Sequence, residues 1–305
     1  MISWLLLLAS QLPTTSRTVA VTFDDLPAAS AQVDQATLAT LTNDLLASLS
    51  RNRVRAVGFV NEGKLYDDAG GIDTARVKLL EQWIQAGHDL GNHTFGHTDV
   101  DQTSLADYER DVLRGEHITR PLMQRYGKTL RFFRHPFLHT GSDAMKKNAL
   151  ERFLKAHGYQ IAPVTIDNYD YVFARAYDVA TARGDSLTAT AIKKSYLAYM
   201  DTVVGFYERQ ARLIVGAEFP QILLLHANRL NAASFDELAV MLRRRRYAFV
   251  SLQQALTHPV YRQHPDRYVG PAGITWLHRW AIGGGMPATI FAGEPEVPTF
   301  VREFR

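Results

Sequence analysis

Residues 19–25 read VAVTFDD, an apolar run that ends in two adjacent aspartates, Asp24 and Asp25. The β-branched residues of this run are typical of a buried strand. Two neighbouring carboxylates at the end of such a strand repel each other and lose hydration, so a bound cation is the simplest way to hold them there. About seventy residues later, the stretch HTFGH places His93 and His97 at a spacing that suits metal ligands. The two stretches together predict a hydrolase that uses a divalent metal.

Composition narrows the class of protein. The 305 residues are 46% hydrophobic, which is enough for a large core and fits one α/β domain of barrel size with an extension. The 34 basic residues are nearly matched by 31 acidic ones, so the net charge of +3 does not indicate a nucleic-acid partner. There is no cysteine, which excludes disulfides, thiolate zinc sites and a cysteine nucleophile. Any metal must therefore be held by histidine and carboxylate groups.

The N-terminus begins with the apolar run MISWLLLLAS. This run is far too short to span a bilayer, and no other stretch predicts a stable membrane insertion. It resembles the hydrophobic part of a secretory signal, without the usual positively charged start. We expect residues 1–16 to be an atypical signal peptide or a disordered tail. The protein would be exported, to the periplasm or the exterior, in the first case and cytoplasmic in the second.

Strand and helix patterns alternate along the rest of the chain, and nearly every strand is a continuous apolar run. Such runs indicate a parallel sheet covered by helices, and they predict a (β/α) barrel. The strands are expected at residues 18–23, 56–60, 88–92, 130–133, 159–166, 221–225 and 247–251. The helices are expected at residues 35–52, 73–86, 104–126, 143–157, 189–215 and 235–245, and Pro121 is expected to kink or break the third one late.

Polar residues of chemical interest follow the apolar part of several strands. In a (β/α) barrel the carboxyl ends of the strands gather on one face and form the active site. A random scatter of histidine and aspartate would not show this preference for strand ends. The residues at these positions are Asp24, Asp25, His93, Arg134, Asp167 and His226.

Two histidines and one carboxylate leave a metal an open position for water, as in catalytic zinc sites. A helical turn would place His93 and His97 on one side. One aspartate of the pair 24/25 would be the third ligand, and the other would act as general base. His226 would protonate the leaving group. Arg134 and Asp167 are charged partners suited to fixing the protonation states of the base and the acid.

Five stretches of the chain resemble, in order, the motifs of the polysaccharide deacetylase family, the NodB-like carbohydrate esterases. VTFDD at 21–25 is similar to the first motif, and GNHTFGH at 91–97 to the second. FRHPF at 133–137 resembles the third, DNYDY at 167–171 the fourth and LLH at 224–226 the fifth. The resemblance covers residues 18 to about 256. It implies a distorted (β/α)7 barrel and the hydrolysis of an N-acetyl amide, less commonly an O-acetyl ester.

The resemblance also implies a role for each matching residue. Asp24 would be the general base, and Arg134 would orient and tune it. His226 would be the general acid, tuned by Asp167, with Asp170 of the same motif as the alternative. The backbone N–H of Phe137 would stabilise the oxyanion. The ligands of a divalent metal, zinc or else Co²⁺, Ni²⁺ or Mn²⁺, would be Asp25, His93 and His97.

The chain departs from the family pattern at two positions. Tyr171 replaces the usual tryptophan beside the acetyl group, and Phe137 lacks a tyrosine hydroxyl. His135 is an additional imidazole, and it and Tyr171 are candidate substrate-binding residues, whereas His139 is expected to be a plain loop residue. We expect a catalytic domain over residues 17–257 and a C-terminal extension, residues 258–305, packed on the barrel.

Three other interpretations compete with a deacetylase acting on an acetylated glycan or a small acetamide. A hydrolase of the same fold could act on a linear or cyclic amide that is not a carbohydrate. A non-catalytic carbohydrate-binding relative would lack one of the catalytic or metal residues, whereas this chain has them all. A phosphatase would need a glycine loop to hold phosphate, and Leu26-Pro27 follows the aspartates instead. The sequence specifies neither the substrate nor the oligomeric state.

Overall fold

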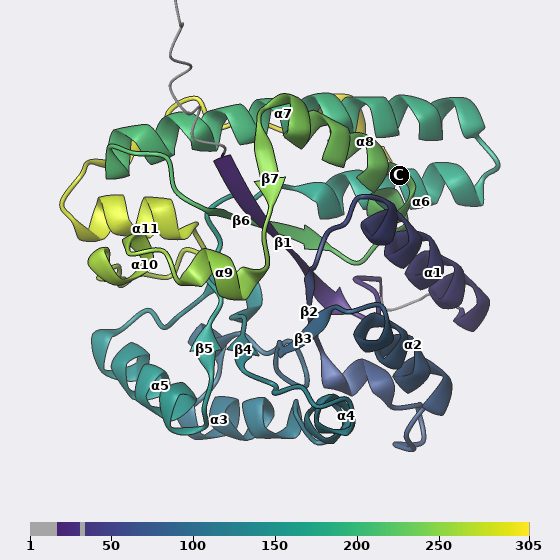
Figure 1. The fold of residues 1–305 in the computed structure, drawn as a ribbon, viewed down its shortest axis with the longest axis horizontal. Coiled ribbons are helices and arrows are strands. Elements are labelled where there is room, and N and C mark those ends of the chain that lie inside the picture. Colours follow the sequence, from purple (N-terminus) through teal and green to yellow (C-terminus); the bar gives the residue numbers. More distant parts are fainter. Residues whose placement is uncertain (1–16, 31–33, 305) are drawn as a thin grey trace, which may run out of the picture.

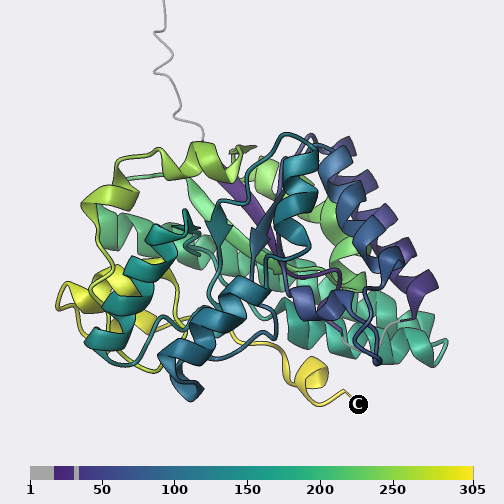
Figure 2. The same ribbon diagram turned by 90° about the horizontal axis from the view of Figure 1, so that it is seen from below.

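The computed structural model describes residues 17–30 and 34–304, so the expected signal peptide lies outside the described residues. Helices surround a central set of strands in both views of the molecule (Figures 1 and 2). The strands are β1 Arg17–Leu26, β2 Val57–Val60, β3 Asp89–Asn92, β4 Phe132–Phe133, β5 Gln160–Ile161, β6 Gln221–His226 and β7 Tyr247–Phe249. The α-helices are α1 Gln35–Arg51, α2 Thr74–Gln85, α3 Leu105–Arg114, α4 Thr119–Arg125, α5 Ala144–Ala156, α6 Asp170–Ala182, α7 Ser186–Val215, α8 Arg229–Arg244, α9 Leu252–Leu256, α10 Val260–Gln263, α11 Trp276–Gly283 and α12 Thr299–Arg302.

The strands are parallel and lie in the order β5-β4-β3-β2-β1-β6, with β7 also paired to β1. The chain beyond β5 returns to β6, where Ile166 forms a bridge with Leu223. The Leu224 N–H donates to the Ile166 carbonyl at 3.1 Å, and the Thr165 N–H donates to the Ile222 carbonyl at 3.0 Å. These bonds link the two ends of the sheet, so the fold is the predicted distorted (β/α)7 barrel.

The continuous apolar strands are explained by burial on both faces. Val21 and Phe23 of β1 belong to the large core that the strands share with the helices. The alternate residue Ala20 belongs to a second, smaller cluster. That cluster is made by other strand residues and by α9, namely Val57, Phe59, Phe132, Ala162, Ile222, Leu252, Ala255 and Leu256. Successive side chains point to opposite faces of a strand. When both faces are buried, apolar residues follow one another along the sequence instead of alternating with polar ones.

The predicted helix over residues 104–126 is two helices, α3 and α4, and the prediction that Pro121 interrupts it is wrong because the break lies before that residue. The chain turns at Gly115, where an added Cβ would lie 2.7 Å from the backbone of Thr94. The second helix starts again at Thr119, and Pro121 lies in its first turn, where a missing N–H costs no helical hydrogen bond. The break therefore comes from close contact with the loop after β3 rather than from the proline.

Two further boundaries differ from the sequence expectation. The strand predicted over residues 159–166 is regular only at β5, because its later part leaves β4 and crosses to β6. The helix predicted from residue 189 begins earlier, at Ser186, because the Asp185 side chain accepts from the Thr188 N–H and so caps the helix there. None of the helices in the described ranges has both the length and the apolar character that crossing a lipid bilayer requires.

Candidate active site

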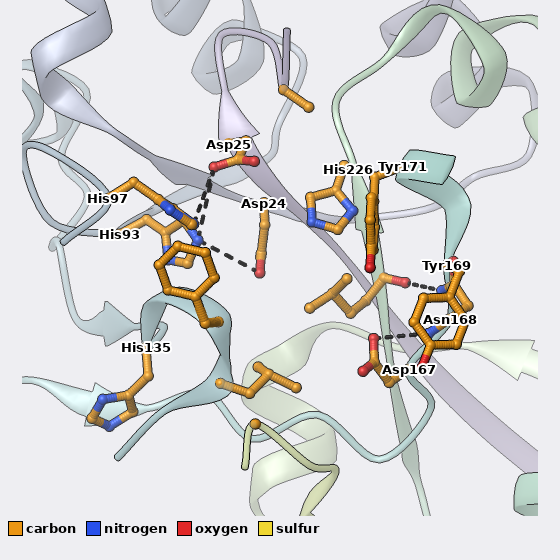
Figure 3. Close-up of a pocket in the computed structure, with 15 residues that line it drawn as sticks. Asp24, Asp25, His93, His97, His135, Asp167, Asn168, Tyr169, Tyr171 and His226 are labelled. Carbon is orange, nitrogen blue, oxygen red and sulfur yellow. Dashed lines mark hydrogen bonds and ion pairs between the residues drawn. The ribbon is translucent and has the colours of Figure 1, made fainter. Parts of the chain in front are cut away.

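The carboxyl ends of the strands bring most of the predicted site residues together. Asp24 pairs with His226 in the register of β1 and β6. His93 directly follows β3, and Arg134 directly follows β4. Figure 3 shows Asp24, Asp25, His93, His97 and His226 around one space. One face of the barrel thus carries two carboxylates and three imidazoles.

Asp25, His93 and His97 form a cluster that could hold a metal ion, with one ligand atom from each residue and all three atoms within 4.8 Å of one another. The Asp25 Oδ1 atom lies 3.6 Å from His97 Nε2 and 4.0 Å from His93 Nε2. Two imidazoles and one carboxylate match the ligand set of catalytic zinc sites, which keep one position open.

The backbone at this cluster is irregular. Residues 93–97 form no helical turn, so that part of the sequence prediction is wrong. Instead the left-handed φ angles of Thr94 (+64°) and His97 (+54°) turn the loop, and Asp25 has a φ of +71°. Non-glycine residues rarely adopt this conformation, and it occurs preferentially at functional sites. Strained backbone at Asp25 and His97 therefore aims two of the three side chains.

The ring of His93 is fixed in the orientation that a metal ligand needs. Its Nδ1–H donates to the carbonyl of Arg134 at 2.8 Å, which leaves a lone pair on Nε2 facing the two aspartates. The Asp25 Oδ1 atom is buried and makes no hydrogen bond with any described residue. An unsatisfied buried carboxylate oxygen beside a free imidazole lone pair fits a bound cation.

The charge states also suit a metal. Burial raises the pKa of Asp25, but Lys64 and the nearby histidines outweigh it and hold that pKa at about 2. The Lys64 Nζ atom lies 3.5 Å from Asp25 Oδ1. Burial lowers the pKa of His93 and of His97 to about 4, so both rings are neutral near pH 7. A charged carboxylate and two neutral imidazoles are the forms that bind divalent ions.

Asp24 lies beside the cluster and is itself buried. Its Oδ2 atom is 3.4 Å from Arg134 Nη1 and 3.8 Å from His93 Nε2. Burial raises the pKa of Asp24, and the Arg134 guanidinium opposes that rise. Arg134 is held by the Thr22 hydroxyl, which accepts from its Nη2 at 3.0 Å, and by the ring of Phe59 at 4.6 Å. Asp24 is thus a carboxylate placed to accept a proton and held by a fixed cation.

His226 is paired with Asp170, and the predicted pairing with Asp167 is wrong. Its Nδ1 atom lies 2.6 Å from Asp170 Oδ1, and its backbone N–H donates to Asp170 Oδ2 at 2.8 Å. The same Oδ2 atom accepts from the amide of Asn231 at 2.6 Å. Burial lowers the pKa of His226, but Asp170 outweighs this and raises the pKa to about 10. His226 is therefore an imidazolium at neutral pH.

Asp167 has a different place in the site. Its Oδ1 atom accepts from the backbone N–H of Asn168 at 2.8 Å, and burial raises its pKa to about 6. Asn168 in turn accepts from the N–H of Asp170 at 2.9 Å, which directs the start of α6. Asp167 lines the cavity across from His97 rather than touching His226 (Figure 3).

The clustered residues line a cavity of about 460 Å³. Its rim is aromatic, because Phe137 is 52% exposed and Tyr171 is 51% exposed. The Phe137 ring lies 4.4 Å from that of His97, and the Tyr171 ring lies 5.9 Å from that of His226. An apolar rim over a polar floor is common in small-ligand sites.

The two additional histidines do not face the metal cluster. The His135 imidazole points away from it in Figure 3, packs against the ring of Phe133 and has both nitrogens buried without a hydrogen bond to any described residue. His135 is nevertheless among the residues that line the cavity, so a substrate contact there stays a prediction. The His139 Nδ1 atom lies 2.9 Å from Asp99, a contact that joins two loops, as a plain loop residue would.

Sequence reasoning missed three residues of this site. Lys64 reaches Asp25 from η1 (Glu62–Leu65), and nothing in the local sequence marks it. Thr22 lies within the first motif, but its hydroxyl contact with Arg134 depends on β4. Asn231 follows His226 by five residues, and the start of α8 directs it onto Asp170. All three are partners of the predicted residues rather than additional reacting groups.

Comparisons with known proteins place the sequence in a family. A family profile described as "Polysaccharide deacetylase" matches residues 11–162. The chain is 27% identical over 161 residues to a chitin deacetylase of Pestalotiopsis sp and 28% identical over 153 residues to one of Colletotrichum lindemuthianum. These matches cover 52% and 50% of this chain, and 45% and 52% of the relatives. The chain thus spans about half the length of the curated relatives it matches.

A comparison with solved structures finds the same fold in a deacetylase. The crystal structure of the chitin deacetylase from Colletotrichum lindemuthianum superposes with a TM-score of 0.53 at 23% identity, covering 79% of this chain and 88% of the other. At that identity the likeness establishes the barrel fold alone. With the profile match and the five motifs, the chain belongs to the polysaccharide deacetylase family.

Proposed function

We propose that this protein is a metal-dependent carbohydrate deacetylase, which hydrolyses the N-acetyl groups, less readily O-acetyl groups, of an acetylated glycan. The observation that carries the proposal is the ligand cluster of Asp25, His93 and His97, which shares one cavity with Asp24 and His226. Every group that amide hydrolysis needs is present in one space.

The residues present fit a divalent metal, and zinc suits them best because all three ligands are carboxylate or imidazole. Asp25 would bind through its unsatisfied Oδ1 atom, and His93 through the Nε2 lone pair that its bond to the Arg134 carbonyl leaves free. When bound, such an ion would acidify a water molecule and polarise the acetyl carbonyl.

Asp24 is the proposed general base. Its carboxylate lies 3.8 Å from His93 Nε2, so it can take a proton from water at the ligand cluster. The Arg134 guanidinium opposes the effect of burial on the pKa of Asp24 and so favours the carboxylate form that a base needs. The pKa of Asp24 is still raised by burial, which makes it a better proton acceptor than an exposed aspartate.

His226 is the proposed general acid. The bond between its Nδ1 atom and Asp170 leaves the Nε2–H to donate to the nitrogen of the leaving amine. An amine is a poor leaving group until it is protonated, so an imidazolium at this position is required. On the opposite side of the cavity, the backbone N–H of Phe137 is the proposed donor to the oxyanion.

The proposal of a sugar substrate is supported by the aromatic rim and by the names of the relatives. Phe137 and Tyr171 present half-exposed rings at the mouth of the cavity, and such rings can stack on the apolar face of a sugar. Both curated relatives are named chitin deacetylases. A small acetamide or another amide remains the alternative, and a non-catalytic role is disfavoured because Asp24 and His226 are both in place.

The test is acetate release by the zinc-loaded protein from a panel of acetylated glycans and simple acetamides. We expect Asp24→Asn to lower kcat by about 10²–10⁴-fold while metal content stays unchanged, because the base contributes to proton transfer only. His93→Ala should lose the metal itself. Full activity of the Asp24 variant would contradict its assignment as base, and absence of acetate from every substrate would contradict the proposed function.

A further inference from the structure

The loop that carries the proposed oxyanion donor is strained. Phe137 and Leu138, in η3 (Pro136–Leu138), have φ angles of +57° and +56°. Two consecutive non-glycine residues in the left-handed region persist only where the surroundings hold them. The N–H groups of Leu138 and His139 donate to the carbonyls of His135 and Pro136. Across residues 17–30 and 34–304, no backbone carbonyl or side chain accepts from the N–H of Phe137.

The surroundings that hold this loop come from the C-terminal extension. Gly273 lines the cavity and lies directly against the loop. A Cβ built at Gly273 would be 1.8 Å from the Phe137 carbonyl oxygen, so only glycine allows this contact. Glycine is needed here because the backbone at residue 273 packs directly against the backbone of Phe137 at the cavity wall.

Arg279 of α11 makes the second contact with the loop, and its side chain is 1% exposed. Its Nη1 atom donates to the Leu138 carbonyl at 3.5 Å, and its Nη2 atom donates to the hydroxyl of Thr140. The planar guanidinium reaches two successive points of the loop at once, which a point charge cannot do. The centres of the Tyr268 and Trp276 rings lie 4.8 and 5.0 Å from the guanidinium carbon, so both rings pack against it.

The extension is itself fastened to the barrel, so it can serve as a fixed support. Asp266 accepts from Arg279 Nε at 2.9 Å and pairs with the Lys147 ammonium of α5 at 3.0 Å. Lys147 also donates to the carbonyls of Asp266 and Tyr268 at 2.7 and 2.8 Å. The backbone N–H of Trp276 donates to the Val164 carbonyl at 2.7 Å. These buried bonds connect α11 to the barrel at two separate places.

We propose that the C-terminal segment from Asp266 to Arg279 is part of the active site, where Arg279 and Gly273 are positioning residues that hold the Phe137 amide toward the cavity. The inference rests on the proposed function for its kinetic consequence, whereas the support of the loop stands on the contacts alone. The segment lies outside the part of the chain that the family profile matches, residues 11–162.

The test compares Arg279→Met, Gly273→Ala and Thr140→Val with the wild type, and uses Arg262→Met as control because Arg262 lies exposed on the same extension. Hydrogen exchange of the Leu138 and His139 amides is measured in each metal-loaded protein. We expect exchange to be at least tenfold faster in Arg279→Met and Gly273→Ala, less so in Thr140→Val, and unchanged in the control. This readout is independent of any enzymatic activity.

Kinetics on the substrate that the wild type deacetylates give the second readout. Misplacement of an oxyanion donor acts on the transition state, so kcat should fall about 10–100-fold while KM stays within twofold. Arg279→Lys should recover only part of the loss. Should Arg279→Met not fold, Thr140→Val carries the same test with little change in volume. Unchanged exchange and unchanged kcat in folded variants would overturn the inference, whereas an inactive wild type with faster exchange in the variants would overturn only the proposed function.

Discussion

Two carboxylates three residues apart, Asp167 and Asp170, have different tasks in the site. Asp170 begins helix α6, and the Asn168 side chain holds its N–H, so its carboxylate turns toward His226. Asp167 stays on the preceding loop and bonds the next backbone N–H. Sequence alone could not choose between them, because the choice depends on where the helix begins and on the position of β6.

The contact with Asp170 gives a prediction for the pH dependence of catalysis. The folded-state pKa of His226 is raised to about 10, so the imidazolium persists below that pH and is lost above it. In Asp170→Asn the charge that raises the pKa is removed while burial still lowers it. The alkaline limb of the kcat/KM profile should therefore move to lower pH, as measured by acetate release from about pH 5 to about pH 11 so that the wild-type limb is included.

Asp167→Asn is the matched control for this prediction, because it removes a nearby carboxylate that does not bond to His226. Its alkaline limb should move much less than that of Asp170→Asn. A larger shift in the Asp167 variant would restore the pairing that the sequence predicts and would contradict the geometry of the structure.

Among the secondary-structure elements, helix α4 depends on a buried acid from another part of the chain. Glu62 of η1 is fully buried and accepts from the backbone N–H groups of Ile118 and Thr119 at 2.7 and 2.9 Å. It also accepts from the Thr119 hydroxyl at 2.8 Å. A carboxylate at a helix N-terminus satisfies free N–H groups and favours the helix dipole. Glu62 thereby ties the end of β2 to the helix behind the metal-ligand loop.

Removal of this acid should destabilise the fold. Glu62→Ala leaves the N–H groups of Ile118 and Thr119 without their acceptor, and the second of these lies in a buried contact. We therefore expect the free energy of unfolding to fall by about 2–4 kcal/mol, as measured by urea denaturation. Glu62→Gln keeps an acceptor oxygen and should cost less. Glu303→Ala, at an exposed glutamate, is the control and should change stability by no more than about 0.5 kcal/mol. Equal stability of Glu62→Ala and the control would contradict the capping role.

The sequence predicts the elements well where local pattern decides them. Residues 19–25 indicate both the strand and the pair of acids near its C-terminal end, because a continuous apolar run followed by two charges is a local feature. The turn at Gly115 is different, because it depends on contact with Thr94 twenty-one residues earlier. The approach of Lys64 to Asp25 likewise requires the assembled barrel. Contacts between distant segments leave no periodic signal in the sequence.

At the scale of the whole molecule, the ligand cluster joins β1 to the loop that follows β3. A metal that binds Asp25, His93 and His97 binds only the folded chain, since the three ligands are separated by nearly seventy residues. It should therefore stabilise the protein by mass action, by about 2.7 kcal/mol when free metal is 100 times Kd. The increase in Tm on adding zinc after chelation measures this effect.

Two histidine variants make that measurement specific. His97→Ala removes a ligand, so the zinc-dependent rise in Tm should largely disappear. His157→Ala removes an exposed histidine far from the cluster in sequence and should keep the full rise. An equal rise in both variants would show that zinc stabilises the protein from another place.

Strand β1 is shared by three neighbours, with β2 along one side and β6 and β7 dividing the other. During synthesis, β1 leaves the ribosome before the other described strands. Asp24, Asp25, His93 and His97 have all emerged long before β6, the strand that pairs with Val19–Asp24. A nascent chain that has not yet reached residue 221 therefore has one edge of β1 unpaired, and an unpaired strand edge can pair with other chains and aggregate. Residues 221–226, which complete this side of β1 and supply His226, are therefore synthesised long after the four residues of the metal cluster and the base.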